Sequence, residues 1–222
     1  MCATLAPAME EDTKKLPVIS DPSRGSYHHG DLHNSLLEAA DCLLEQTGAA
    51  KLSLREVAKH AGVSHTAPYR HFKNRAALLE AIAIAGFRRL KTLLEKAEAS
   101  APDDMVQQLR AGGLAYLQVA VNNPEHTRLM FGGMMKEVSE DSALFAAAED
   151  TYDTLYRIID TGRARGVFGG SDTETVVLAA WSLVHGLTML ILGTQKVNPA
   201  TPAELDAITR SVLDTFLNGL RA

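Results

Sequence analysis

Apolar residues recur every three or four positions along most of the 222-residue chain, from about residue 31 to residue 220. No stretch alternates apolar and polar residues as a half-buried strand does, so the pattern predicts an all-α protein. The first predicted helix follows Asp31, which is a suitable N-cap, and ends before Gly48. Its buried stripe is expected to comprise Leu36, Leu37, Ala40, Leu43 and Leu44.

Two short helices separated by a tight turn are predicted next. Ser53 and Glu56 have the spacing of a capping box, and Gly62 stands where the chain must leave the helix through a positive φ. We expect Ser64 to cap a second short helix, with Pro68 in its first turn, where a missing backbone amide costs little. This order of signals predicts a helix-turn-helix.

A long helix over residues 74–100, capped by Asn74, is predicted after it. The helix is apolar in its first turns and amphipathic later, so it should pack on both halves of the protein. Five more helices are predicted, at residues 102–122, 124–135, 142–165, 172–192 and 202–220. The predicted division is a disordered tail at residues 1–26, a helix-turn-helix DNA-binding domain at 27–75 and a helical sensing and dimerisation domain at 76–222.

The predicted helix at 172–192 is apolar nearly all round. The 17 residues from 176 to 192 reach only the lower limit for crossing a bilayer, and Ser182 and His185 interrupt them with no basic flank. We therefore expect no membrane span but a helix buried on every side. Together with the last helix, whose apolar residues include Leu213 and Phe216, it is expected to form a homodimer surface.

Charge is concentrated on the helix-turn-helix. The segment from Lys51 to Lys91 contains nine lysines and arginines and two acidic residues, a local net charge of +7. The net charge of the whole chain is −5, so the remaining residues carry −12. A basic segment on an acidic protein favours phosphate binding by that segment alone. The alternative is a small helical subdomain with a solvated basic face.

The run SLREVAKHAGVSHTAPYRHFKNRAALLEA, residues 53–81, resembles the DNA-binding head of the TetR family of bacterial transcriptional regulators. The resemblance implies an all-helical homodimer in which the head binds double-stranded operator DNA and a larger body senses a ligand. Thr66 stands where that family often has glycine, and Ala67 where it often has a phosphate-contacting threonine or serine. Its landmarks here are Ala58, Gly62, Val63, Tyr69, His71, Phe72 and Leu78.

Base contacts are expected from His65 and Thr66, because the N-terminal residues of a recognition helix meet base edges in the major groove. Phosphate contacts are expected from Tyr69, Lys73 and Arg75. The full predicted set of DNA-binding residues is Ser53, Arg55, Ser64, His65, Thr66, Ala67, Tyr69, His71, Lys73 and Arg75.

Other chemistry finds little support in the sequence. The chain has neither the G-x-S-x-G nucleophile elbow nor a glycine-rich phosphate loop, so we expect no enzyme and no cofactor. Cys2 and Cys42 have no CxxC or Cys/His spacing, and the adjacent His28 and His29 lack a third ligand, so no metal site is predicted. The first residues lack the apolar core of a signal peptide, which favours a cytoplasmic protein.

The body offers aromatic and methionine side chains for a small, mostly hydrophobic effector. The segment from Trp181 to Gly186 also looks like the Trp-x-x-x-His-Gly signature of one TetR body type, with His185 as the best polar anchor. The same residues can equally pack a core, which would favour a ligand-independent DNA-binding or architectural protein over a ligand-released repressor. The predicted pocket residues are Tyr116, Met130, Phe131, Met134, Tyr152, Tyr156, Trp181, His185 and Met189.

Overall fold

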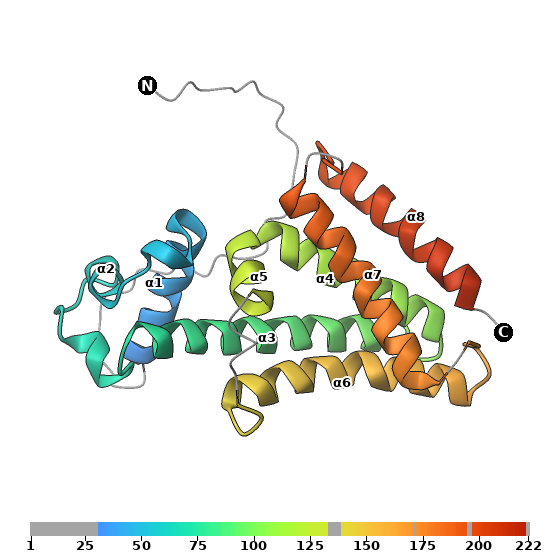
Figure 1. Cartoon of the computed structure of the whole chain (residues 1–222), viewed down its shortest axis with the longest axis horizontal. Helices are drawn as coiled ribbons and strands as arrows, with labels where there is room; N and C mark the ends of the chain where they lie inside the picture. The colour runs from blue at the N-terminus through green and yellow to red at the C-terminus, as the bar shows by residue number, and fades with distance from the viewer. Residues whose placement is uncertain (1–30, 133–138, 171, 195–196, 221–222) are drawn as a thin grey trace.

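The computed structural model describes residues 31–132, 139–170, 172–194 and 197–220, and every regular element in these ranges is a helix, as predicted (Figure 1). The predicted tail, Cys2, the paired histidines and Met134 lie outside the described residues. The elements are α1 (Asp31–Thr47), η1 (Ala49–Lys51), α2 (Leu54–His60), η2 (Ala67–Arg70), α3 (Arg75–Ala99), α4 (Met105–Asn122), α5 (Pro124–Phe131), α6 (Ala143–Ala164), α7 (Thr173–Gly193) and α8 (Pro202–Leu220).

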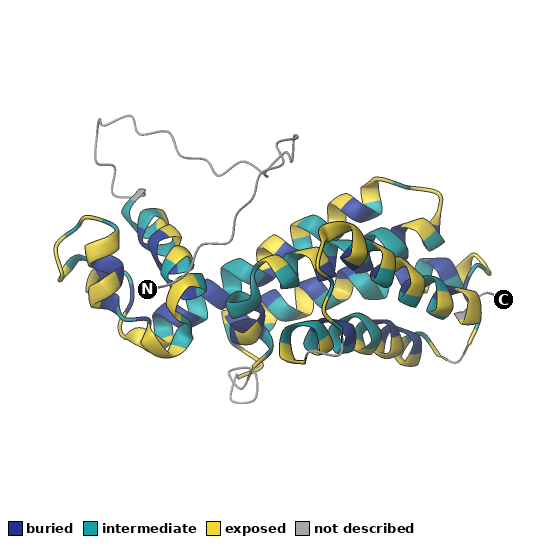
Figure 2. Ribbon diagram, turned by 90° about the horizontal axis from the view of Figure 1, so that it is seen from above, coloured by how far each residue is buried: buried dark blue, intermediate teal, exposed yellow. Residues whose placement is uncertain are grey.

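The helices form two parts joined by α3 (Figure 1). The first part, which we call the head, comprises α1, η1, α2 and η2 at one end of the molecule. The second part, the body, comprises α4 to α8. Helix α3 starts in the head and runs through the body, where it packs on α4, α5 and α6. Figure 2 shows buried residues along the inward sides of these helices and exposed residues over the outer turns.

The predicted caps of α2 and α3 are confirmed. Ser53 Oγ accepts a hydrogen bond from the amide of Glu56 at 3.2 Å, and Asn74 Oδ1 accepts from the amide of Ala77 at 2.9 Å. The chain leaves α2 at Gly62, whose φ is 68°. This left-handed conformation costs other residues more free energy than it costs glycine. These signals act within a few residues of one another, which is why the sequence alone sufficed to find them.

The predicted second helix of the helix-turn-helix is shorter and tighter than expected. No side-chain cap starts it, and Ser64 Oγ lies 3.2 Å from the Thr66 hydroxyl instead. Pro68 has no amide to donate to the Ser64 carbonyl, and the Ala67 amide donates to that carbonyl at 3.0 Å. The segment therefore forms a 3₁₀ turn over Ala67–Arg70, and the prediction that Ser64 caps an α-helix is wrong.

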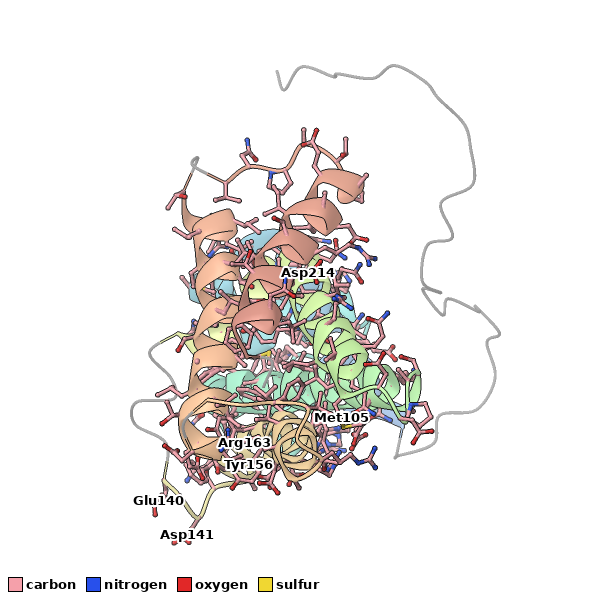
Figure 3. All side chains as sticks on the ribbon, turned by 90° about the vertical axis from the view of Figure 1, so that its right-hand side faces the viewer. Met105, Glu140, Asp141, Tyr156, Arg163 and Asp214 are labelled. Carbon is pink, nitrogen blue, oxygen red and sulfur yellow. The ribbon has the colours of Figure 1, made fainter. Side chains whose placement is uncertain are left out.

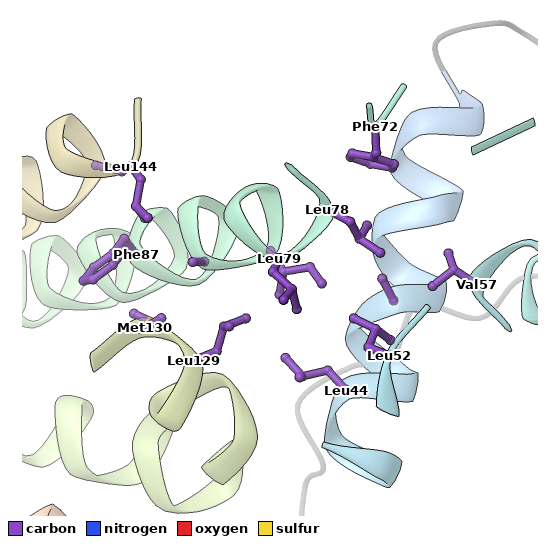
Figure 4. Close-up of a cluster of buried hydrophobic side chains, with 14 of the residues drawn as sticks. Leu44, Leu52, Val57, Phe72, Leu78, Leu79, Phe87, Leu129, Met130 and Leu144 are labelled. Atoms are coloured by element: carbon purple, nitrogen blue, oxygen red, sulfur yellow. The ribbon is translucent and has the colours of Figure 1, made fainter. Parts of the chain in front are cut away.

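One continuous apolar core joins the head to the body (Figure 4). Leu44, Leu52 and Val57 fill its head end, and Phe87, Leu129 and Leu144 fill its body end, with Leu78 and Leu79 of α3 between them. The predicted boundary between residues 75 and 76 lies in the first turn of α3 and stays a prediction. Because the head and the body share buried side chains, a displacement of α3 or α5 changes the packing of the head.

Helix α7 is not buried on every side, contrary to the prediction. Val176, Val177 and Ala180 are buried, but Leu178 is 54% exposed and Leu190 is 46% exposed. Among the described residues this is the one helix long and apolar enough to cross a membrane by length and composition. In the structure it packs on α4 and α6, so one side belongs to the body core and one side is open.

Leu213 of α8 points into its own subunit, so the structure does not support it as a dimer contact, and the part of Phe216 in the dimer surface stays a prediction. Leu213 is only 3% exposed, and a Cβ placed on Gly113 of α4 would lie 2.8 Å from its Cδ2 atom. Through this close contact, α8 packs tightly against α4. Asp214, labelled in Figure 3, accepts from Arg110 Nη2 at 2.6 Å and reinforces the contact.

Candidate functional site

The end of the head presents a polar and basic surface. The segment from Ser64 to Thr66 is exposed, and so are Arg55 and Lys73. Tyr69 is 57% exposed, the largest exposed fraction among the large hydrophobic side chains of the described chain. An uncovered tyrosine beside lysine and arginine side chains suits contact with a phosphate backbone.

Buried neighbours hold this surface in place. Pro68 is buried against α2, and Phe72, which is 2% exposed, anchors the end of η2 in the head core. The ring of His71 lies 5.7 Å from that of His33 on α1, so His71 is half-buried between the two elements. Tyr69 and Arg70, between the two anchors, are left facing outward.

Arg75 has a structural partner that the sequence did not indicate. Its Nε atom donates to the carbonyl of Leu52 at 2.9 Å, and its Nη2 atom donates to the carbonyl of Ala49. The guanidinium thus ties the start of α3 to the loop between α1 and α2. A side chain engaged in this way has fewer donors left for a phosphate than Lys73 has.

The body encloses a cavity of about 510 Å³, within the range of small-molecule sites. Helices α3, α4, α6, α7 and α8 supply most of its walls, and Phe131 at the end of α5 completes them. The lining residues are Phe87, Leu90, Leu94, Leu109, Gly112, Gly113, Tyr116, Phe131, Ala148, Glu149, Thr151, Tyr152, Leu155, Ile158, Ala180, Trp181, Val184, His185, Leu213 and Phe216.

An aromatic network occupies one part of the cavity wall. Tyr116 Oη lies 2.8 Å from His185 Nδ1, and the ring of Phe131 lies 5.0 Å from the imidazole. Burial raises the pKa of the Tyr116 phenol above its usual range, and the Trp181 indole, which hydrogen-bonds to the phenol, opposes this only in part. Burial also lowers the pKa of His185. At neutral pH both groups are therefore uncharged.

The structure brings five of the nine predicted pocket residues to the cavity wall, namely Tyr116, Phe131, Tyr152, Trp181 and His185. Met130 instead packs on α3, where a Cβ at Gly86 would lie 2.6 Å from its sulfur atom. Tyr156 packs against a separate core cluster near Met105, both labelled in Figure 3. Met130, Tyr156 and Met189 are therefore not lining residues.

Most of the aliphatic residues that line the cavity were not predicted, because a leucine that faces a cavity and a leucine that fills a core have the same spacing along a helix. The adjacent glycines Gly112 and Gly113 were a usable signal, since two small residues in mid-helix leave space on one face. No group of three or more histidine, cysteine or acidic side chains in the described ranges is placed to hold a metal ion.

A charged cluster fastens α5 to the head. Glu45 of α1 accepts from the amides of Glu125 and His126 at 3.3 and 2.9 Å, which satisfies the free N-terminus of α5. The imidazole of His126 lies between two carboxylates, with Nδ1 2.7 Å from Glu45 Oε1 and Nε2 3.1 Å from Asp41 Oδ1. Helix α5 thus touches the head at one end and the cavity at the other.

Two family profiles match the chain. Residues 36–82 match the profile described as bacterial regulatory proteins, tetR family, and residues 109–216 match tetracyclin repressor-like, C-terminal domain. The first covers most of the head and the start of α3, and the second covers the cavity-bearing body. The narrower Trp-x-x-x-His-Gly body type stays a prediction.

Similar proteins include both solved structures and curated sequences. A protein with unknown function from Rhodococcus sp. RHA1 is 35% identical with a TM-score of 0.77, over 90% of this chain and 100% of that one. The TetR family transcriptional regulator PfmR from Thermus thermophilus is 24% identical with a TM-score of 0.64, over 84% and 99%, a likeness of fold.

Nucleoid occlusion factor SlmA from Aliivibrio fischeri (strain MJ11) is 33% identical over 104 residues, 45% of this chain and 50% of that protein. The match with this relative thus spans about half of its length. The helix-turn-helix head, the cavity-bearing helical body and the two family profiles lead to one assignment: the chain belongs to the TetR family of DNA-binding transcription regulators.

Proposed function

We propose that this protein is a cytoplasmic repressor whose ligand-free homodimer binds a near-palindromic operator and whose operator affinity falls when a small, mostly hydrophobic molecule enters the body. The observation that carries the proposal is the apolar cavity of about 510 Å³, whose walls include α3 and α5, the two helices that also contact the head. A ligand that favours another arrangement of these helices shifts the spacing of the two heads.

A second candidate is a ligand-independent DNA-binding protein. The match to a nucleoid occlusion factor favours it, because that name describes a role at the nucleoid. A body filled by its own side chains would also favour it. The open cavity supports the sensor instead, since empty apolar volume in a core costs stability and persists where it has a use.

The DNA contacts are tested by two variants that should fail differently. Lys73→Ala removes a proposed phosphate contact, so it should weaken binding to all sequences and reduce the salt slope by about one unit. Thr66→Ala removes a proposed base contact and should change the preference among operator variants. Lys96→Ala, an exposed lysine in the last turn of α3, is the matched control and should leave binding unchanged. Equal losses on every sequence for Lys73→Ala and Thr66→Ala would refute the assignment.

The sensing step is tested through Trp181, which is the only tryptophan in the chain and lines the cavity. Ligands that enter the cavity should change its fluorescence and release operator at the same concentration. By thermodynamic linkage, operator should weaken ligand binding by the same factor. Ligands that change Trp181 fluorescence without ever releasing operator would leave the ligand-independent candidate.

A further inference from the structure

The described walls of the body cavity carry charge of one sign only. Glu149 is the single acidic residue that lines the cavity, and no lysine or arginine of the described chain lines it. A carboxylate or phosphate taken into such a cavity would lose its hydration and find no cation to replace it. The lining therefore penalises an anionic ligand.

Glu149 and a second carboxylate, Glu174, act on the lining residue Tyr152. Burial raises the pKa of the Tyr152 phenol, and the charges of Glu174 and Glu149 raise it further. Both carboxylates are exposed, on α7 and α6 respectively. Their field opposes the approach of an anion along this side of the cavity.

The inner polar group is a hydrogen-bond donor. Tyr116 Oη lies 2.8 Å from His185 Nδ1, so this nitrogen is engaged within the wall, and we take the phenol as the donor to it. The neutral imidazole then carries its proton on Nε2. No described residue accepts a hydrogen bond from this Nε2–H, while His185 itself lines the cavity.

A further polar side chain of the lining, Thr151, is already engaged. Thr151 Oγ1 lies 3.1 Å from the carbonyl of Phe87 and 2.9 Å from that of Ala147. Its hydroxyl proton is therefore directed at the backbone of α3 and α6. This leaves the imidazole of His185 as the inner donor for a ligand, surrounded by aromatic and aliphatic side chains.

We propose, on the basis of the proposed function, that the effector is an uncharged, largely apolar molecule with one hydrogen-bond acceptor, such as a ketone or ester oxygen, placed against His185, and that carboxylates and phosphates of the same skeleton are rejected. The selection has two separable parts. Glu149 and the lack of a cation among the described lining residues disfavour anions, and His185 orients the acceptor.

The experiment compares 2-decanone with decanoate, which have ten carbon atoms each and differ in charge. Binding to the full chain is followed by Trp181 fluorescence and by thermal stability at neutral pH. 2-Decanone should bind at least tenfold more tightly than decanoate. His185→Phe, which keeps an aromatic ring and removes the donor, should weaken 2-decanone several-fold, and His60→Phe, at an exposed position of α2, should not.

The outcomes separate this inference from the proposed function. Decanoate binding as tightly as 2-decanone and releasing operator would overturn the selection against anions while the protein remained a ligand-responsive regulator. An unchanged affinity of His185→Phe for 2-decanone would overturn the role of His185. Binding of neither molecule, by fluorescence or by thermal stability, would overturn the inference, while operator release by another small molecule would still support the sensing function.

Discussion

Arg75 shows how a single side chain can hold the recognition surface without being part of it. Its guanidinium donates to the carbonyls of Leu52 and Ala49, which lie in the connection between α1 and α2. The Ala49 carbonyl also accepts from the amide of Leu52 at 3.3 Å, so the guanidinium adds to a backbone turn that is already closed. The side chain thus fixes the start of α3 relative to Ser53, the cap of α2.

Replacing Arg75 by Met should therefore destabilise the head. Hydrogen bonds that involve a charged group contribute roughly 1.5–3 kcal/mol, so we expect the free energy of unfolding in urea to fall by about 2 kcal/mol. Arg55→Met is the matched control, because Arg55 is exposed on α2 and its loss should change stability by less than about 0.5 kcal/mol. Equal effects of the two replacements would mean that the carbonyl contacts contribute nothing to stability.

The sequence predicted those residues whose partners are close in the chain. Ser53 and Asn74 bind amides three positions away, so their spacing was sufficient evidence. Arg75 binds carbonyls 23 and 26 positions away, which only the folded chain brings near. The prediction that Ser64 caps a helix was wrong for a local reason. Pro68 lacks an amide N–H, and the segment forms a 3₁₀ turn where the start of an α-helix was expected.

At the level of elements, α5 is a second connection, besides α3, between the cavity and the head. Its first residues are capped by Glu45 of α1, and its last residue, Phe131, lies on the cavity wall. Arg128 pairs with Glu125 on the exposed side, and Arg89 of α3 lines the same small pocket as His126. The charged groups near His126 thus include Asp41, Glu45, Glu125, Arg128 and Arg89. The carboxylates of Asp41 and Glu45 are the two that contact the imidazole.

The contact between α1 and α5 should weaken as pH rises. Burial lowers the pKa of His126, but the hydrogen bonds and charges of Asp41 and Glu45 outweigh it, so the folded-state pKa is raised. A raised pKa stabilises the folded state fully below the unfolded value of about 6.5, and this contribution is lost as pH rises through the folded value. Amide hydrogen exchange in α1, corrected for the intrinsic pH effect, should accelerate across this interval.

The variant His126→Gln keeps hydrogen-bonding groups but cannot gain a proton, so it should remove this pH dependence. His60→Gln alters an exposed histidine of α2 and should retain it. If the His126→Gln protein shows the same pH dependence as the unaltered chain, the cluster does not link the head to the body in the way described.

The sequence predicted the helices of the body but not their pairing. Helix α5 was predicted as far as residue 135 and is described as ending at Phe131, and its contact with α1 could not be foreseen because Asp41 and His126 are 85 positions apart. Periodicity indicates which face of a helix is apolar, yet it cannot tell whether a neighbouring helix, a cavity or a second subunit covers that face. Helix α7 has apolar residues in the core, on the cavity wall and on the open side.

At the scale of the whole molecule, the open side of α7 is an apolar surface that the described chain leaves uncovered. Leu178, Ser182, Gly186 and Leu190 follow one another at intervals of four residues, and a Cβ on Gly186 would have no atom within 4 Å. Small residues between two exposed leucines allow another helix to approach closely. The proposed homodimer would cover this surface with α7 of the second subunit, with α8 alongside.

Dimerisation through α7 predicts that Leu178→Asp and Leu190→Asp sediment as monomers while their helical content is unchanged. A carboxylate placed between two subunits is desolvated without a partner, whereas on the open side of a lone chain it stays hydrated. Ala146→Asp, on an exposed position of α6, is the control and should remain dimeric.

Operator affinity should fall with the loss of the dimer, because one head cannot reach two half-sites about 34–36 Å apart. Leu213→Asp would give no such evidence, since Leu213 is buried in the core of its own subunit and its replacement should unfold the body. Variants at Leu178 and Leu190 that stayed dimeric and kept their operator affinity would place the subunit contact on another surface.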